Sequence, residues 1–271
     1  MANVTVNGVN LFYELIGNDE AKETVLFLNG VMASTSSWSF QTPVFEKMGF
    51  RILLHDFRGQ LKSEKPQGSY SFHLHATDTI ALMDHLGIDK AHLIGTSYGG
   101  EVAMRLAIDY PDRVKTISII DSVSELDEVL KYFVLGWINL AKQQDGEGFF
   151  WGMMPSIYYQ DYIVKNMDML KKRAATMNKV PADYLEGQIN LYNTFLNDVY
   201  MTEELYKIQS KALVICGQND ILKPVKFSKI IADNIPNSEF AIIPDCGHVI
   251  IFEKPDILNS MLLGFIMKTL G

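Results

Sequence analysis

Short apolar runs alternate along most of the chain with longer segments in which apolar residues recur at helical spacing. Strands that alternate with helices are typical of a mostly parallel sheet covered by helices on both faces. The pattern therefore predicts an α/β fold with an eight-stranded sheet. Strands are expected at residues 3–6, 11–15, 25–28, 52–55, 91–94, 116–120, 213–216 and 240–243, and helices near 38–47, 74–86, 102–110, 225–234 and 256–268.

The pattern changes between residues 122 and 206, where helices are expected and no strand is obvious. We interpret 122–206 as a helical cap inserted after the sixth strand, and 1–121 with 207–271 as one core domain. Ligands of open α/β sheets bind at the carboxyl ends of the strands, so the cap should roof the site. Its many methionines and aromatic residues either line a pocket for an apolar acyl chain or pack the cap helices together.

Composition narrows the classes of partner. The chain of 271 residues carries a formal net charge of −8 and has a pI near 5.3, which disfavours a nucleic-acid partner. Neither a signal-peptide pattern nor an apolar run long enough to span a membrane is present. The two cysteines, Cys216 and Cys246, form neither a disulfide framework nor a zinc site. We therefore expect a cytoplasmic protein that acts on a small molecule, without a membrane partner.

The candidate nucleophile is Ser97. Residues 95–99 read Gly-Thr-Ser-Tyr-Gly, between an apolar strand and a helical segment, which is the setting of a G-x-S-x-G nucleophile elbow. The glycines leave room for a sharp turn that lifts the serine hydroxyl out of the sheet. The free Tyr98 N–H and the helix dipole then face developing negative charge. A structural glycine-rich turn is the competing interpretation.

A serine hydroxyl needs a base, and the base needs an orienting acid. His248 follows the last strand, where a loop can return it to the elbow, and Asp220 follows the preceding strand. The order Ser97, Asp220, His248 is the chain order of the α/β-hydrolase triad. Asp121, which ends the strand after the elbow, competes with Asp220 for the role of the acid.

The loop that starts at Asn29-Gly30-Val31 follows an early strand, where this type of fold takes its second oxyanion donor. With the elbow and the triad order, the chain resembles the α/β-hydrolase superfamily, most closely its small esterases, lactonases (3-oxoadipate enol-lactonases among them) and C–C-bond hydrolases. The resemblance implies that the Val31 N–H joins the Tyr98 N–H at the oxyanion. The family's loop usually begins His-Gly, so Asn29 is a departure.

Other polar residues are given structural interpretations. Residues 55–63 are similar to a family segment, Asp-x-Arg-Gly-x-Gly-x-Ser, in which we expect an Asp56–Arg58 pair to hold the loop. His73 and His75 alternate like a metal pair, but no ligand cluster completes a site, so a solvated loop is expected. Cys246 lies two residues from His248 and is interpreted as a bystander rather than a reactive thiol.

These residues predict acyl transfer to water on an ester, thioester, lactone or activated C–C bond, without a metal or organic cofactor. A serine at the elbow argues against the dehalogenase and epoxide hydrolase chemistry of the superfamily, which uses an aspartate there. Two alternatives remain open from the sequence: an acyltransferase or perhydrolase, and a slow-turnover ligand sensor with an intact triad. The fold does not choose the substrate.

Overall fold

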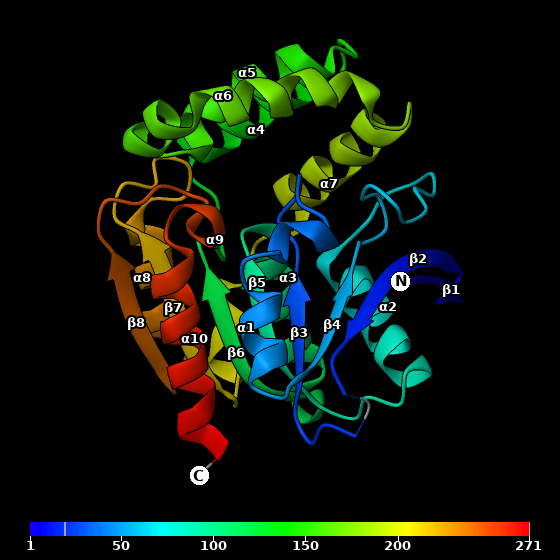
Figure 1. Cartoon of the computed structure of the whole chain (residues 1–271), viewed down its shortest axis with the longest axis vertical. Helices are drawn as coiled ribbons and strands as arrows, with labels where there is room; N and C mark the ends of the chain where they lie inside the picture. Colours follow the sequence, from blue (N-terminus) through cyan, green and yellow to red (C-terminus); the bar gives the residue numbers. More distant parts are fainter. Residues whose placement is uncertain (19, 271) are drawn as a thin grey trace.

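The computed structural model describes residues 1–18 and 20–270. Its centre is an eight-stranded sheet with the strand order β1-β2-β4-β3-β5-β6-β7-β8 (Figure 1). The pairs β1–β2 and β2–β4 are antiparallel, and all later pairs are parallel. The strands are β1 (Ala2–Val6), β2 (Val9–Ile16), β3 (Thr24–Leu28), β4 (Arg51–His55), β5 (Ala91–Thr96), β6 (Val114–Ile120), β7 (Lys211–Gly217) and β8 (Ser238–Ile243). The predicted α/β class and the eight strands are confirmed.

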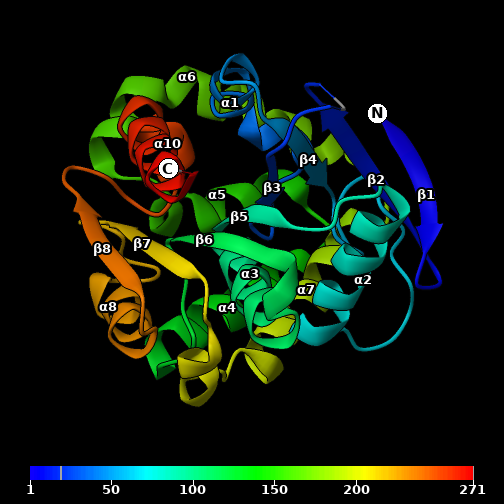
Figure 2. The same cartoon turned by 90° about the horizontal axis from the view of Figure 1, so that it is seen from below.

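The two faces of the sheet bury different side chains. Along β3, Val25 and Phe27 belong to one apolar cluster, while Leu26 and Leu28 belong to the other. This alternation follows from the two-residue period of a strand, and an unbroken apolar run indicates a strand buried on both faces. Figure 2 shows helices on both sides of the sheet, with α1 and α10 on one side and α2, α3 and α8 on the other.

The helices that cover the sheet lie close to their predicted positions. They are α1 (Thr42–Lys47), α2 (Phe72–His85), α3 (Tyr98–Asp109), α8 (Val225–Asn234) and α10 (Pro255–Leu270). A short helix that was not predicted, α9 (Ile250–Glu253), precedes α10. The single helix expected at 38–47 is wrong: a 3-10 turn, η1 (Thr35–Trp38), precedes a separate α1. Pro43 stands in the first turn of α1, where its missing N–H is tolerated, whereas it would break a helix that began at Trp38.

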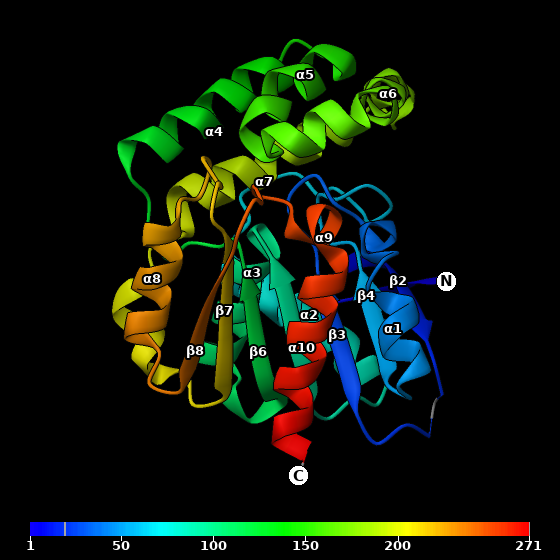
Figure 3. The ribbon, with the colours of Figure 1, turned by 60° about the vertical axis from the view of Figure 1, so that its left-hand side comes forward.

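Four helices between β6 and β7 form what we call the helical insertion. They are α4 (Glu128–Ala141), α5 (Gly146–Ile157), α6 (Gln160–Thr176) and α7 (Tyr184–Asp198). Figures 1 and 3 show them stacked above the edge of the sheet at which the parallel strands end. Three further short 3-10 segments are η2 (Pro111–Arg113), η3 (Met177–Lys179) and η4 (Thr202–Lys207). Among the described residues, no helix is both long and apolar enough to cross a membrane.

Candidate active site

Ser97 lies on a strained turn between β5 and α3. Its backbone has φ 52° and ψ −121°, which is a rare conformation for a residue other than glycine. The glycines around it are required by close approach: a Cβ on Gly95 would meet the Gly99 carbonyl, and a Cβ on Gly99 would meet the Leu28 carbonyl. The sequence motif is therefore a sterically tight turn that presents the Ser97 side chain to the pocket.

Ser97, His248 and Asp220 are brought together by three different loops. The Ser97 Oγ lies 3.0 Å from His248 Nε2, and His248 Nδ1 lies 2.7 Å from Asp220 Oδ2. The other Asp220 oxygen, Oδ1, accepts hydrogen bonds from the Leu222 and Lys223 N–H groups, each at 2.9 Å. Asp220 is thus fixed by its own loop, and one of its oxygens is left for the imidazole.

Asp121, the competing acid, lies beside this line without joining it. One carboxylate oxygen of Asp121, one of Asp220 and a ring nitrogen of His248 all lie within 4.8 Å of one another. The Asp121 Oδ1 accepts a hydrogen bond from the Gly217 N–H at 2.9 Å, whereas it is Asp220 that contacts the imidazole. Burial, reinforced by the neighbouring Asp220 carboxylate, raises the pKa of Asp121 well above its usual range. Two acids with such different surroundings are suited to different roles.

The loop after β3 is braced by side-chain amides. Asn29 donates from Nδ2 to the His55 carbonyl at 2.9 Å, and its Oδ1 accepts from Trp38 Nε1 at 2.9 Å. Gln60 Nε2 donates to the carbonyl of Gly30 at 2.8 Å and to that of Val31 at 3.2 Å. These bonds do the bracing in a loop that lacks the family's usual histidine. Val31 and Tyr98 both line the pocket beside Ser97.

The expected Asp56–Arg58 pair is wrong. Arg58 instead binds Asp78 of α2 with two hydrogen bonds of 2.5 and 2.7 Å. Asp56 accepts from the N–H groups of Thr35 and Lys62 at 2.9 and 3.1 Å. Two backbone N–H donors satisfy Asp56, and a bidentate partner on α2 satisfies Arg58, so the pair that proximity in sequence suggested does not form.

The solvated loop expected at His73 and His75 is also wrong, because both residues lie in α2. Ser71 caps this helix by accepting from the Leu74 N–H at 3.0 Å. His75 is fully buried, and its Nε2 lies 2.8 Å from the Tyr98 hydroxyl. Burial lowers the pKa of His75 to about 3. His75 is therefore neutral at physiological pH and holds the residue next to Ser97.

The two cysteines lie near the site but are buried. Burial and the nearby Asp121 carboxyl raise the pKa of Cys216 to about 12. The pKa of Cys246 is also raised, by burial and by Glu253. Both thiols are protonated at neutral pH, as expected of bystanders rather than nucleophiles.

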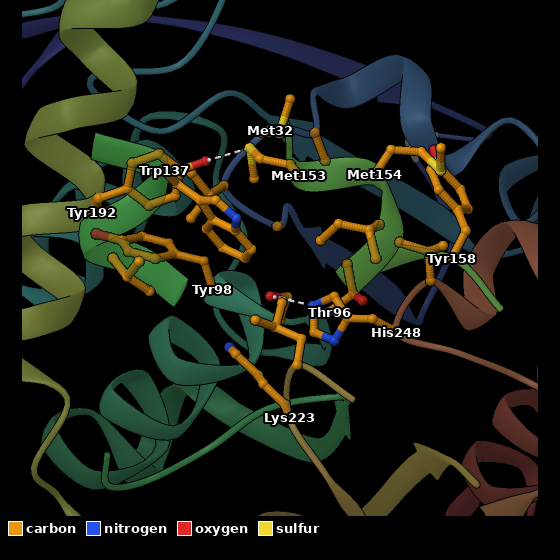
Figure 4. A pocket seen from close by; sticks show the side chains of 18 of the residues that line it. Met32, Thr96, Tyr98, Trp137, Met153, Met154, Tyr158, Tyr192, Lys223 and His248 are labelled. Atoms are coloured by element: carbon orange, nitrogen blue, oxygen red, sulfur yellow. Dashed lines mark hydrogen bonds between the residues drawn. The ribbon is translucent and has the colours of Figure 1, made fainter. Parts of the chain in front are cut away.

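A pocket opens between the strand ends and the helical insertion. Its empty space is about 930 Å³, counted with its opening to solvent. Ser97 and His248 form part of the wall, and most of the remaining wall is apolar (Figure 4). Many of the apolar side chains come from the insertion, namely Leu130, Val134, Trp137, Phe150, Met153, Met154, Ile157, Tyr158, Tyr192 and Phe195. Several aromatic and methionine residues of the insertion therefore do line a pocket.

The helical insertion also touches the His248 loop through main-chain atoms. The His248 N–H donates to the Ile157 carbonyl at 3.0 Å. The carboxylate of Glu253 accepts from the Tyr159 N–H at 3.1 Å and from the Gly247 N–H at 2.8 Å. One half-buried side chain thus bridges the start of α6 and the loop that carries His248. The sequence analysis did not single out Glu253. The available signal was the presence of a charged residue in a short apolar stretch.

Comparison with known proteins agrees with this architecture. Residues 23–255 match the family model of the alpha/beta hydrolase fold, and the chain belongs to this family. A Caulobacter segnis protein, provisionally named carbamate hydrolase RutD, is 27% identical over 98% of this chain and 99% of its own length. A 2-hydroxy-6-oxononadienedioate/2-hydroxy-6-oxononatrienedioate hydrolase of Comamonas testosteroni is 25% identical, with coverages of 97% and 95%.

Solved structures of other proteins have the same fold. The alpha/beta hydrolase MGS-M2, from a deep-sea metagenome library of the Medee basin, superposes with a TM-score of 0.92 at 28% identity, covering 98% of this chain and 97% of its own. Est816, described as an N-acyl homoserine lactone degrading enzyme, gives 0.82 at 29% identity, with coverages of 97% and 100%. The predicted superfamily is confirmed, and relatives named as hydrolases support a hydrolase activity.

Proposed function

We propose that the protein is a serine hydrolase in which Ser97 is the nucleophile, His248 the general base and Asp220 the orienting acid. His248 Nε2 takes the proton of Ser97 Oγ as the oxygen attacks a carbonyl carbon. The N–H groups of Val31 and Tyr98 stabilise the oxyanion. The protonated imidazole then gives its proton to the leaving group, and an acyl-enzyme remains on Ser97.

Water completes the cycle in the same geometry. His248 accepts a proton from the attacking water, the tetrahedral intermediate collapses, and Ser97 leaves with the proton from the imidazole. Asp220 holds the Nδ1–H tautomer throughout, so that Nε2 faces the serine. The observation that carries this proposal is the continuous line from Ser97 Oγ through the imidazole to Asp220, with contacts of 3.0 and 2.7 Å.

The substrate class is a small, partly apolar molecule with an ester, thioester, lactone or activated C–C bond. The apolar pocket wall supports this choice, and relatives are named for carbamate, lactone and C–C hydrolysis. Residues 122–206 act in this proposal as a cap on a core of 1–121 and 207–271. The cap selects the apolar part of the substrate, because the insertion supplies much of the apolar wall while the nucleophile, base and acid come from the core.

The test is hydrolysis of short-chain p-nitrophenyl esters by the wild type and by Ser97→Ala. We expect kcat to fall by at least about 10⁴-fold in the variant, because only binding and oxyanion stabilisation remain. Ser124→Ala is the matched control, since Ser124 is a buried serine whose hydroxyl binds Thr202. Labelling by a fluorophosphonate should be lost in Ser97→Ala and kept in Ser124→Ala. Equal turnover in a folded Ser97→Ala would refute the proposal.

A further inference from the structure

Lys223 is one of the few polar residues that line the mostly apolar pocket. It lies three residues after Asp220 and lines the pocket, although its side chain is only 4% exposed. The ammonium Nζ donates to Glu101 Oε1 at 2.9 Å and lies 4.8 Å from the centre of the Phe195 ring. Lys223 therefore has a fixed position in the wall.

The carboxylate that pairs with Lys223, that of Glu101, does not line the pocket. Glu101, in the first turn of α3, is fully buried and is not part of the pocket wall. Its Oε1 also accepts from the Val123 N–H at 2.9 Å, which ties it to the segment after β6. A lysine ammonium has three donors, and among the described residues only Glu101 accepts from this one. Two of the three donors of the Lys223 ammonium therefore have no acceptor among the described residues.

The charged side chains of the pocket wall also favour an anionic group in the substrate. In the described part of the chain, Lys223 and Arg173 are the permanently charged side chains that line the pocket, and no carboxylate lines it. Arg173 donates to the Tyr158 hydroxyl at 3.1 Å. Figure 4 shows Tyr158 and Lys223 at different places in the pocket wall, and the two cations are held by different partners, Tyr158 and Glu101. The chain has a net charge of −8, yet the charged side chains of this wall are cations, and the carboxylate that pairs with Lys223 lies behind the wall.

The position of Lys223 assigns it to one side of the reaction. Figure 4 shows the Lys223 side chain pointing away from His248. The leaving group must lie next to His248 Nε2, because that atom protonates it. An acyl part that extends away from His248 would then reach the side of the pocket on which Lys223 stands.

We propose that Lys223 binds a carboxylate at the far end of the substrate's acyl group, so that the preferred product is a short dicarboxylic acid. This inference rests on the serine hydrolase function proposed above and names its substrate class. A charge-assisted hydrogen bond in a dry pocket is strong and directional. Glu101 acts as the positioning residue that aims the ammonium and compensates it before substrate binds.

A purely structural ion pair is the competing explanation. Buried pairs contribute little net stability compared with apolar residues of similar size, but removal of one partner is strongly destabilising. Lys223→Met alone leaves Glu101 buried without its cation. The double variant Lys223→Met/Glu101→Gln removes both charges and provides a folded protein in which substrate selection is measured.

The first experiment compares two p-nitrophenyl esters of equal shape, the glutaryl monoester and the 5-methylhexanoyl ester, in which an isopropyl group replaces the carboxylate. The measured quantity is the ratio of their kcat/KM values. We expect the wild type to favour the glutaryl ester, and we expect this ratio to fall at least tenfold in both Lys223→Met and the double variant. If the double variant differs from the wild type in stability but keeps the same ratio of kcat/KM values, the ion pair is purely structural and the proposal is overturned.

Two further variants serve as references. Lys226→Met removes an exposed lysine that binds Asp127, and it should leave the ratio as in the wild type. Arg173→Met removes the second cation of the pocket wall. If the ratio collapses in Arg173→Met and persists without Lys223, the carboxylate binds at Arg173 and the proposal is wrong.

Binding separates this inference from the proposed function. In calorimetry, Ser97→Ala should bind succinate, glutarate or adipate at least tenfold more tightly than Ser97→Ala/Lys223→Met does. 5-Methylhexanoate should show no such difference. This result would support the site even if Ser97 proved not to be the nucleophile. Active hydrolysis by the wild type, together with dicarboxylate binding that ignores Lys223, would refute the inference and keep the hydrolase.

Discussion

The strand ends and the helical insertion contribute to one pocket in different ways. At the strand ends, backbone geometry fixes the reacting groups: Ser97 has a positive φ, and Asp220 is held by two adjacent N–H donors. The insertion contributes apolar side chains with few polar contacts, such as the Tyr192 hydroxyl at 3.4 Å from the Met153 sulfur. The difference indicates that the chemistry and the selection of apolar groups belong to separate parts of the chain, which should respond to substitution on different scales.

The largest effect is expected at the strand ends, where two neighbouring carboxyl groups provide a direct contrast. Asp220→Asn should lower kcat about 10⁴-fold, because the amide no longer stabilises the correct imidazole tautomer. Asp121→Asn removes a group that does not bind the imidazole and should lower kcat less than about tenfold. Steady-state kinetics of both folded variants decides the matter. The reverse order of effects would make Asp121 the acid.

An intermediate effect is expected where the two regions meet. Glu253→Gln keeps one acceptor but loses the second, so the Gly247 or the Tyr159 N–H is left unpaired and His248 is positioned less well. We expect kcat to fall about tenfold, with KM for a short ester nearly unchanged. Glu239→Gln, at an exposed pair with Lys268, is the control. A change confined to KM would show that Glu253 acts on the insertion rather than on His248.

A smaller effect is expected within the insertion. Met154 lines the pocket and is half-buried, so Met154→Ala enlarges the cavity without emptying the core. The preference for longer over shorter acyl esters should rise about three- to tenfold, as for a few methylenes in an apolar pocket. Met169→Ala, on an exposed part of α6, should not change it. A loss of fluorophosphonate labelling at Ser97 in Met154→Ala would contradict the separation of roles.

The smallest effect on turnover is expected in the core, where the change concerns stability. His75 has a folded-state pKa of about 3, lowered by burial, against an ordinary value of 6.5. The unfolded state therefore binds a proton between pH 6.5 and 3 that the native state refuses, and native stability falls as the pH falls. The deficit in unfolding free energy of His75→Gln relative to wild type should shrink by about 1.4 kcal/mol per pH unit in this window. Denaturation at pH 7 and pH 5 measures it, and a constant deficit would contradict it.

Local patterns predicted the strand ends well. The Gly-x-Ser-x-Gly spacing and the positions of Asp220 and His248 after apolar runs place all three residues at one edge of the sheet. Contacts across long sequence separations were not predictable in this way. Glu101 and Lys223 are 122 positions apart, and each reads alone as an ordinary surface charge. The sequence prediction paired Arg58 with Asp56, its near neighbour. Nothing local in the sequence indicates that Arg58 contacts Asp78, which lies 20 positions later in α2.

The contacts between the insertion and the His248 loop use the insertion's main chain, at the Ile157 carbonyl and the Tyr159 N–H. A main-chain atom is supplied by almost any residue. Mutations in the insertion can therefore change the shape and polarity of the pocket over evolutionary time while the junction keeps its geometry. The same feature gives a practical rule for building chimaeras. A foreign insertion need only reproduce the backbone course through residues 157–159 to be grafted onto this core.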